Sequence, residues 1–294
     1  MLEELIFKHL QSFRNDLEPY LASYGDYLAI FAGKAPDDMD ETWNDGKSQY
    51  GRIVFYLDTN TDPEREVSGK LAVDVFCEDG AQNVGEIESV VRPIINGYFF
   101  SCGDMTIAAQ WHDSRKFVEP TNKVCGTTIS YDLYAFPSQT TCDPDPIALL
   151  NLYTKEAIPN ARVIGLEDTG EIFKPTNDIP AIYWRAMSVS KCAWILDTFS
   201  CSWQTMICRA HIIAEDNNVM ASTARRLDNA LTLQKSLLFD NGTTLRVDRN
   251  NQVNSGADPM KQGQLTVEAT YGILNIIKSG KIENIYYTDT DRRG

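Results

Sequence analysis

Three histidines and seven cysteines are the first candidates for chemistry in this sequence, as acid–base, nucleophilic or metal-binding groups. His112 precedes Asp113, and an imidazole oriented by a carboxylate could activate a thiol such as Cys102 or Cys125. These positions fall among expected strand residues, however, and no Gly-x-Ser-x-Gly turn presents a nucleophile. Four residues on or beside successive strands could place metal ligands across one sheet, namely Cys77, Cys102, His112 and Cys125. No Cys-x-x-Cys pair is present, however, to help close a tetrahedral site. We therefore expect buried free thiols, no bound metal and no cofactor.

Nucleotide chemistry has no support either. The sequence lacks both the Gly-x-x-x-x-Gly-Lys-Ser/Thr phosphate loop and a Gly-x-Gly-x-x-Gly turn after a strand. Trp184, Trp194 and Trp203 could line a site for a small molecule or a peptide, although tryptophans more often fill a core or an interface. We expect a protein that is not an enzyme, and a soluble ligand-binding module is kept as an alternative.

The elements that must position these residues follow an order that occurs twice. Residues 2–137 and 146–275 each read as a helix, two strands, a second helix after an acidic turn, and two further strands. Strands are expected at 52–58, 71–77, 105–111 and 127–136 in the first copy, and at 181–187, 203–214, 243–248 and 264–274 in the second. Longer helices are expected at 2–24, 84–96 and 217–238. Two copies without evident chemistry favour a structural or assembly role, because an enzyme keeps its catalytic groups in at least one copy.

The fold class predicted from this order is α+β, with two tandem similar domains. Each would be a mixed, mostly antiparallel sheet of about four strands packed against two helices. Residues 1–140 would form the first domain and 146–294 the second, with a stiff linker at 137–146 that contains Pro144 and Pro146. Two unrelated α+β domains are the alternative, because aligning Gly126 with Gly263 puts the apolar positions of the two last strands on opposite faces.

Charge is distributed unevenly along the chain. The net charge is −14, and residues 1–140 contain 23 Asp and Glu against 11 Lys and Arg, whereas residues 141–294 contain 18 against 16. The acidic first half disfavours specific nucleic-acid binding, which needs basic patches. An acidic wall would suit a channel along which DNA slides without sticking, whereas the simpler interpretation is that the charge only keeps the protein soluble. No apolar run approaches the ~18 residues of a membrane span.

Two polar stretches of the first half, residues 33–50 and 59–70, are expected to project as loops and to contact a partner or a neighbouring subunit. The candidate interface residues on them are the anchors Trp43, Tyr50 and Arg65, together with Asp37, Asp38 and Lys70. The strands add an unusually aromatic outward face, which indicates either a covering helix or a subunit interface. That face is formed by Tyr56, Phe76, Tyr134 and Phe136.

Several short strings in the first half occur in the order found in one protein family. They are Lys-Ala-Pro-Asp-Asp at 34–38, Gly-Arg-Ile-Val-Phe at 51–55, Asp-Pro-Glu-Arg at 62–65, Ser-Gly-Lys-Leu at 68–71, Val-Asp-Val-Phe-Cys at 73–77, Gly-Tyr-Phe-Phe at 97–100 and Ser-Tyr-Asp-Leu-Tyr-Ala-Phe-Pro at 130–137. Through these strings residues 2–137 resemble the tail-completion proteins, or tail terminators, of long-tailed bacteriophages and phage-tail-like particles. The second half resembles this family only in the order of its elements.

The resemblance implies a small α/β domain whose copies form a hexameric ring on the end of the tail tube distal to the baseplate. Such a ring ends tube polymerisation and offers a surface to the head-completion or neck protein, while DNA passes through its lumen without specific binding. The implied partners are the chain itself, the tail tube protein, the neck protein and, as a further candidate, a sheath protein. The chain would belong to the tail or neck of the virion after assembly in the host cytoplasm, with no membrane involved. Another neck or tail adaptor is the alternative role.

The second half allows two arrangements. Three chains could supply six domains to one ring, or six chains could form a ring from their first halves and carry the second halves outside it. The uneven charge favours six chains, because domains that line one lumen equally should be comparably acidic.

Overall fold

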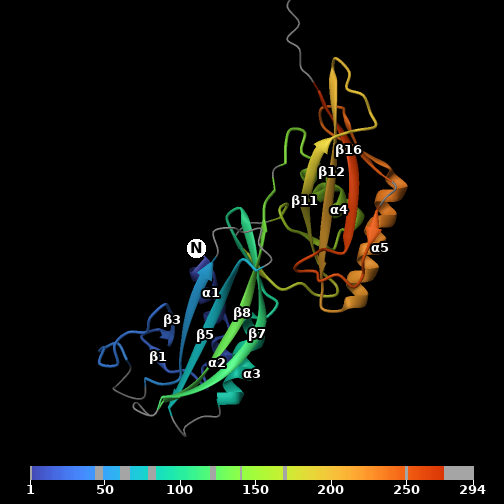
Figure 1. The fold of residues 1–294 in the computed structure, drawn as a ribbon. Helices are drawn as coiled ribbons and strands as arrows, with labels where there is room; N and C mark the ends of the chain where they lie inside the picture. Colours follow the sequence, from blue (N-terminus) through green and yellow to red (C-terminus); the bar gives the residue numbers. More distant parts are fainter. Residues whose placement is uncertain are drawn as a thin grey trace, which may run out of the picture.

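The computed structural model describes residues 2–43, 49–59, 67–78, 84–119, 124–139, 141–167, 171–248 and 251–274. In this part of the chain the protein is mostly β, with 43% strand and 23% helix, and it forms two curled seven-stranded sheets and five helices (Figure 1). The predicted α+β class, with about four strands and two helices in each domain, is therefore wrong. Most of the additional strands are two to four residues long, which is too short for alternation to be visible in the sequence.

The first sheet has the strand order β10-β6-β7-β8-β5-β4-β3. Its strands from the first half are β3 (Ile30–Ala32), β4 (Arg52–Thr59), β5 (Gly69–Glu78), β6 (Phe99–Cys102), β7 (Met105–Glu119) and β8 (Val124–Pro137). The seventh, β10 (Ile172–Phe173), comes from the second half and pairs with β6. Every neighbouring pair is antiparallel except β3 with β4. A separate small hairpin pairs β1 (Ser23–Tyr24) with β2 (Tyr27–Leu28).

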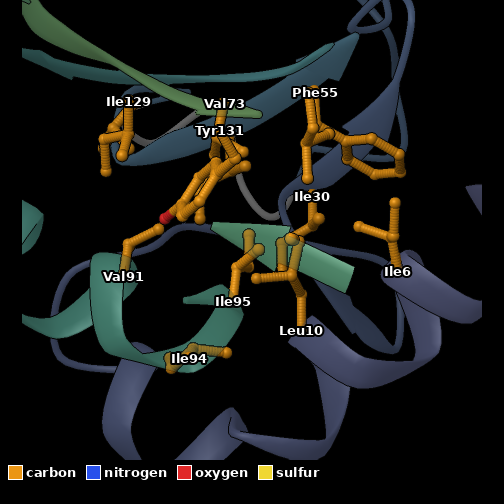
Figure 2. Close-up of a cluster of buried hydrophobic side chains, with 14 of the residues drawn as sticks. Ile6, Leu10, Ile30, Phe55, Val73, Val91, Ile94, Ile95, Ile129 and Tyr131 are labelled. Atoms are coloured by element: carbon orange, nitrogen blue, oxygen red, sulfur yellow. The ribbon is translucent and has the colours of Figure 1, made fainter. Parts of the chain in front are cut away.

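Three helices, α1 (Leu2–Ser12), α2 (Arg14–Leu17) and α3 (Val84–Ile95), belong to the first half. The helix expected at 2–24 is broken at Phe13, ahead of Pro19, where the Ser12 hydroxyl donates to the carbonyl of His9. Helices α1 and α3 pack against one face of the sheet. Figure 2 shows the resulting core, in which side chains of the two helices face side chains of the strands. The helix residues are Ile6 and Leu10 of α1 and Val91 and Ile95 of α3, and the strand residues are Phe55, Val73, Ile129 and Tyr131.

The second sheet has the strand order β13-β14-β16-β12-β11-β9, with β15 also paired to β16. Its strands are β9 (Arg162–Val163), β11 (Ala181–Lys191), β12 (Cys201–Ile213), β13 (Ser236–Leu238), β14 (Thr244–Val247), β15 (Gln252–Val253) and β16 (Leu265–Leu274). The helices α4 (Pro146–Ala157) and α5 (Asn217–Gln234) contribute to its core. Helix α5 ends four residues earlier than expected, because Lys235 adopts a φ of +59° and the chain continues directly as β13.

Six strands of one sheet correspond in order to six strands of the other, and β10 and β15 have no counterpart. The order β6-β7-β8-β5-β4-β3 in the first matches β13-β14-β16-β12-β11-β9 in the second, and in each the short strand at one end runs parallel to its neighbour. A helix precedes each set of strands and another follows the second long strand. The β11–β12 hairpin is therefore the counterpart of the β4–β5 hairpin, in which Thr59 pairs with Gly69.

A third apolar cluster joins the two halves and accounts for part of the outward aromatic face. Tyr134 and Phe136 are buried against residues of the second half, among them Tyr183 and Ile164. The second half of the same chain therefore covers these two aromatic residues. The sequence had led us to expect a covering helix or a subunit interface instead. Tyr56 stays exposed on the same sheet. In the described part of the chain no helix is both long and apolar enough to cross a membrane.

Candidate interaction surfaces

Four of the six predicted interface residues lie together beside the start of β4. Asp38 accepts a 2.8 Å bond from the guanidinium of Arg52, and the Tyr50 hydroxyl lies 3.4 Å from the same carboxylate. The Arg52 guanidinium also lies 5.1 Å from the centre of the Tyr50 ring and 5.5 Å from that of Phe76. Arg52 was not predicted as a site residue, because it reads as an ordinary outward position at the beginning of a strand. It nevertheless organises this cluster.

Trp43 belongs to the same region but is only 4% exposed. Its ring packs edge-on against Tyr24 at 4.9 Å and Phe31 at 5.8 Å, and its indole nitrogen donates to the carbonyl of Asp37 at 3.0 Å. Trp43 therefore fixes the backbone of residues 37–43 from within the chain. The exposed surface of this segment consists of the residues around it.

The segment that Trp43 holds is strongly acidic. Residues 26–43 contain Asp26, Asp37, Asp38, Asp40 and Glu41 against a single cation, Lys34. Hydrogen bonds from the side chain and backbone of Thr42 keep the pKa of Asp40 below its ordinary value, so this carboxylate stays ionised at neutral pH. Residues 26–43 include β3, the edge strand of the first sheet, and four of their five carboxylates follow this strand at residues 37–41, which concentrates negative charge at that edge.

The other two predicted residues do not join this cluster. Arg65 lies outside the described residues. Lys70 is on β5 opposite Asp58 and Asp132, whereas Arg52 pairs with Phe76 at the other end of the strand. With a rise of roughly 3.3 Å per residue, about six residues separate Lys70 from the Arg52 cluster by some 20 Å.

Lys70 instead borders a hollow of about 300 Å³ on the face of the first sheet that has no helix. His112, the additional residue of a β-bulge in β7, lies 3.0 Å from the Asp132 carboxylate. The neighbouring Asp113 accepts a 2.9 Å bond from Arg115, which holds the pKa of Asp113 below its usual range. These groups are paired with one another on an open strand surface, and no thiol lines the hollow.

The histidines and cysteines do not form the catalytic or metal arrangements considered from the sequence. His9 and His211 are buried and bond to the backbone carbonyls of Ile94 and Pro259. Burial raises the pKa of the Cys77 thiol to about 11, and Cys77 pairs across the strands with Cys125. Among the described residues no group of three or more His, Cys, Asp or Glu could hold a metal ion, and all seven cysteines are free.

The three tryptophans considered for ligand binding have separate environments. Trp184 is buried and donates to the Thr154 hydroxyl at 2.8 Å, and Trp203 has Arg246 over its ring. Trp194 is 60% exposed on the turn between β11 and β12, where Leu196 and Phe199 are 88% and 84% exposed. This apolar turn was not predicted as an interface. In the sequence this connection of nine residues contains four large apolar residues, a composition that is typical of a buried segment.

No family model, curated protein or solved structure matches this chain.

Proposed function

We propose that this chain is a tail terminator of a long-tailed phage or a phage-tail-like particle, a structural protein that caps the tube and joins it to the neck. The observation that carries the proposal is the separation of charge between two halves of corresponding topology. The first half has a net charge of −12 and the second of −2, although both sheets have the same strand order. Charge that served only solubility would not need to be confined to one half.

The acidic half is suited to surround a polyanion without binding it. Each Lys or Arg that faces a phosphate backbone adds an attraction and therefore friction, whereas carboxylates repel the backbone. The segment 26–43 supplies this repulsion from an edge of the sheet, where Trp43 holds the backbone at Asp37 and Arg52 holds the Asp38 carboxylate. In this proposal six first halves surround the DNA path, and the nearly neutral second halves lie outside, toward a neck or sheath protein.

The family resemblance of residues 2–137 supports the same role. The chain would assemble in the host cytoplasm with the tail tube protein and the neck protein as partners and would remain in the virion.

Electron microscopy of particles made with and without this chain tests the role. Particles that lack it should carry tubes of uncontrolled length that do not join heads, and labelled chains should lie at the head-proximal end of the tail. Tails of normal length, joined normally to heads, would refute the proposal. A map with threefold-related chains whose two halves alternate around the lumen would refute the six-chain arrangement alone.

A further inference from the structure

The turn between β11 and β12, residues 192–200, is held rigidly by its polar groups. The Cys192 amide donates to the Trp203 carbonyl at 2.9 Å, and the Thr198 amide donates to the Cys201 carbonyl at 2.8 Å. The Asp197 carboxylate accepts from the Trp203 amide at 3.1 Å and pairs with Lys191 at 2.7 Å. The Lys191 ammonium keeps the pKa of Asp197 below its usual value, so this clamp is charged at neutral pH. We call residues 192–200 the apolar tip.

The apolar tip presents large side chains to solvent while its polar groups are used internally. Trp194, Leu196 and Phe199 are exposed, although a turn of this length usually exposes polar residues. A set of exposed aromatic and aliphatic side chains is typical of an interface, and a turn whose backbone is already hydrogen-bonded loses less conformational entropy when it is buried. The tip therefore needs an apolar acceptor.

The first half contains an apolar hollow of about 530 Å³ between α2 and α3. Its lining is mostly apolar, with two polar residues of α2, Asn15 and Asp16, among the lining residues. The apolar lining residues are Phe13, Pro19, Tyr20, Val90, Pro93 and Ile94. We call this hollow the helix groove. A volume of this size accommodates one or two large side chains.

The apolar tip and the helix groove lie at opposite ends of the molecule. In Figure 1 the β11–β12 hairpin projects at the top of the second half, whereas α2 and α3 lie at the bottom of the first. A single chain therefore cannot place its own tip in its own groove. From this arrangement we infer that the tip of one copy docks into the helix groove of a second copy, in a head-to-tail contact that leaves a free tip and a free groove at the two ends.

Charge favours a second copy over other occupants. Residues 192–200 contain one charged residue, Asp197, which Lys191 neutralises, so the tip has no cation for a phosphate or an anionic lipid surface. The helix groove belongs to the strongly acidic first half, which would repel an occupant of like charge. A contact between the nearly neutral second half of one copy and the first half of the next avoids this repulsion.

The area that such a contact can bury explains why it should occur more than once per chain. Aromatic side chains bury roughly 150–250 Å² each, so two aromatics and a leucine provide less than the roughly 800 Å² per partner of a standard stable interface. A copy that gives its tip to one neighbour and receives another tip in its groove makes two such contacts, and in a closed ring both must break before it can leave. Head-to-tail contacts of this kind close rings when the rotation permits. This inference concerns how copies join and does not depend on a role at a phage tail.

Light scattering on the full chain during size-exclusion chromatography tests the contact. The parent chain should form concentration-dependent oligomers. A tip variant, Trp194→Ser with Phe199→Ser, and a groove variant, Val90→Arg, should each raise the dissociation constant by at least about 30-fold, as loss of a hot spot does. Because the tip variant keeps its groove and the groove variant keeps its tip, mixing the two at concentrations above the dissociation constant of a single contact should give a one-to-one dimer that grows no further.

Leu233→Ser is the matched control, since Leu233 is 81% exposed on α5 and belongs neither to the apolar tip nor to the lining of the helix groove, and it should assemble as the parent does. Leu196→Ser removes an exposed side chain without disturbing the core, and it should weaken assembly even if Val90→Arg unfolds. A parent chain that stays monomeric would overturn the inference. Tip variants that keep the mass of the parent assembly would also overturn it, and this outcome is expected if residues 275–294 or a different protein cover the tip. A mixture of the tip and groove variants that gives no one-to-one species would overturn it as well.

Discussion

The Tyr183 hydroxyl donates a 2.8 Å hydrogen bond to the carbonyl oxygen of Pro137, the last residue of β8, and so joins the two sheets. Beneath this bond the Tyr183 ring meets the Phe136 ring edge-on at 5.2 Å within the third apolar cluster. Arg185 adds a bond to the Ala135 carbonyl, and β10 extends the first sheet with residues of the second half. The halves therefore share buried surface as well as a covalent connection.

Replacing Phe136 by Ala should uncouple the two halves. The loss of a buried ring costs about 3–5 kcal/mol, and here the loss falls on the cluster between the sheets. Urea denaturation followed by tryptophan fluorescence and by circular dichroism should change from one coincident transition to two. Tyr183→Phe removes only the hydroxyl and should cost about 1 kcal/mol with the transitions still coincident. Two transitions in the parent chain would show that the shared cluster does not couple the halves.

His211 should make the protein less stable in mild acid. It is buried among Phe136 and Tyr183, and burial, with smaller contributions from Arg185 and Arg209, lowers its pKa to about 4. Above a pH of about 6.5, the pKa of this histidine in the unfolded state, its protonation does not reduce the free energy of unfolding. As the pH falls from 6.5 toward 4, the free energy of unfolding decreases, because the unfolded state binds a proton that the folded state does not. The loss over this window amounts to about 3 kcal/mol.

The measurement is the free energy of unfolding at several pH values between 7 and 4. His211→Gln should flatten the slope in this range relative to the parent, whatever its effect on stability at pH 7. Leu233→Ser is the control, since it changes an exposed side chain that does not titrate, and it should leave the slope unchanged. An unaltered slope in the His211 variant would assign the pH dependence to other groups, of which buried His9, whose pKa is also lowered, is the first.

Alternation in the sequence located the long strands because each has one face against helices. The expected strand at 71–77 lies within β5, where Leu71, Val73 and Val75 are fully buried. The pattern could not show β9 or β10, which have two residues each and depend on backbone pairing with distant strands. Strand β7 continues eight residues past its expected end at Trp111, because the bulge at His112 shifts the alternation.

The candidate interfaces could be predicted only where the residue types in a loop indicated a contact. Loop composition led to Asp38, Tyr50 and Trp43, which the structure brings to one region, but burial of Trp43 depends on Tyr24 and Phe31. The helix groove could not be predicted, because it exists only where the break at Phe13 sets α2 against α3. That break follows from tertiary packing, which overrides the helical periodicity of residues 2–24.

Gly126 should resist substitution because β5, β7 and β8 approach one another closely at this position. A Cβ atom there would clash with the carbonyl oxygen of Val75 and with the Phe117 ring, which packs over the glycine and against Phe76 at 5.4 Å. Gly126→Ala should therefore destabilise the protein by about 1–3 kcal/mol, the usual cost of overpacking. Gly256→Ala is the control, since its nearest neighbouring atom would lie 3.7 Å away, and its thermal midpoint should stay near that of the parent.

Trp43→Ala separates a structural role of this residue from a direct role in binding. Loss of a buried indole should cost about 3–5 kcal/mol and release residues 37–43, because the bond to the Asp37 carbonyl and the packing on Phe31 disappear together. Hydrogen exchange should accelerate in this acidic segment while the amides of β5 remain protected. Asp37→Asn, which keeps the backbone carbonyl, should leave exchange in the segment unchanged. If Trp43→Ala abolished assembly but left hydrogen exchange in residues 37–43 unaltered, the indole would be a direct contact residue. Its ring would then have to be more exposed in the free chain than the 4% observed.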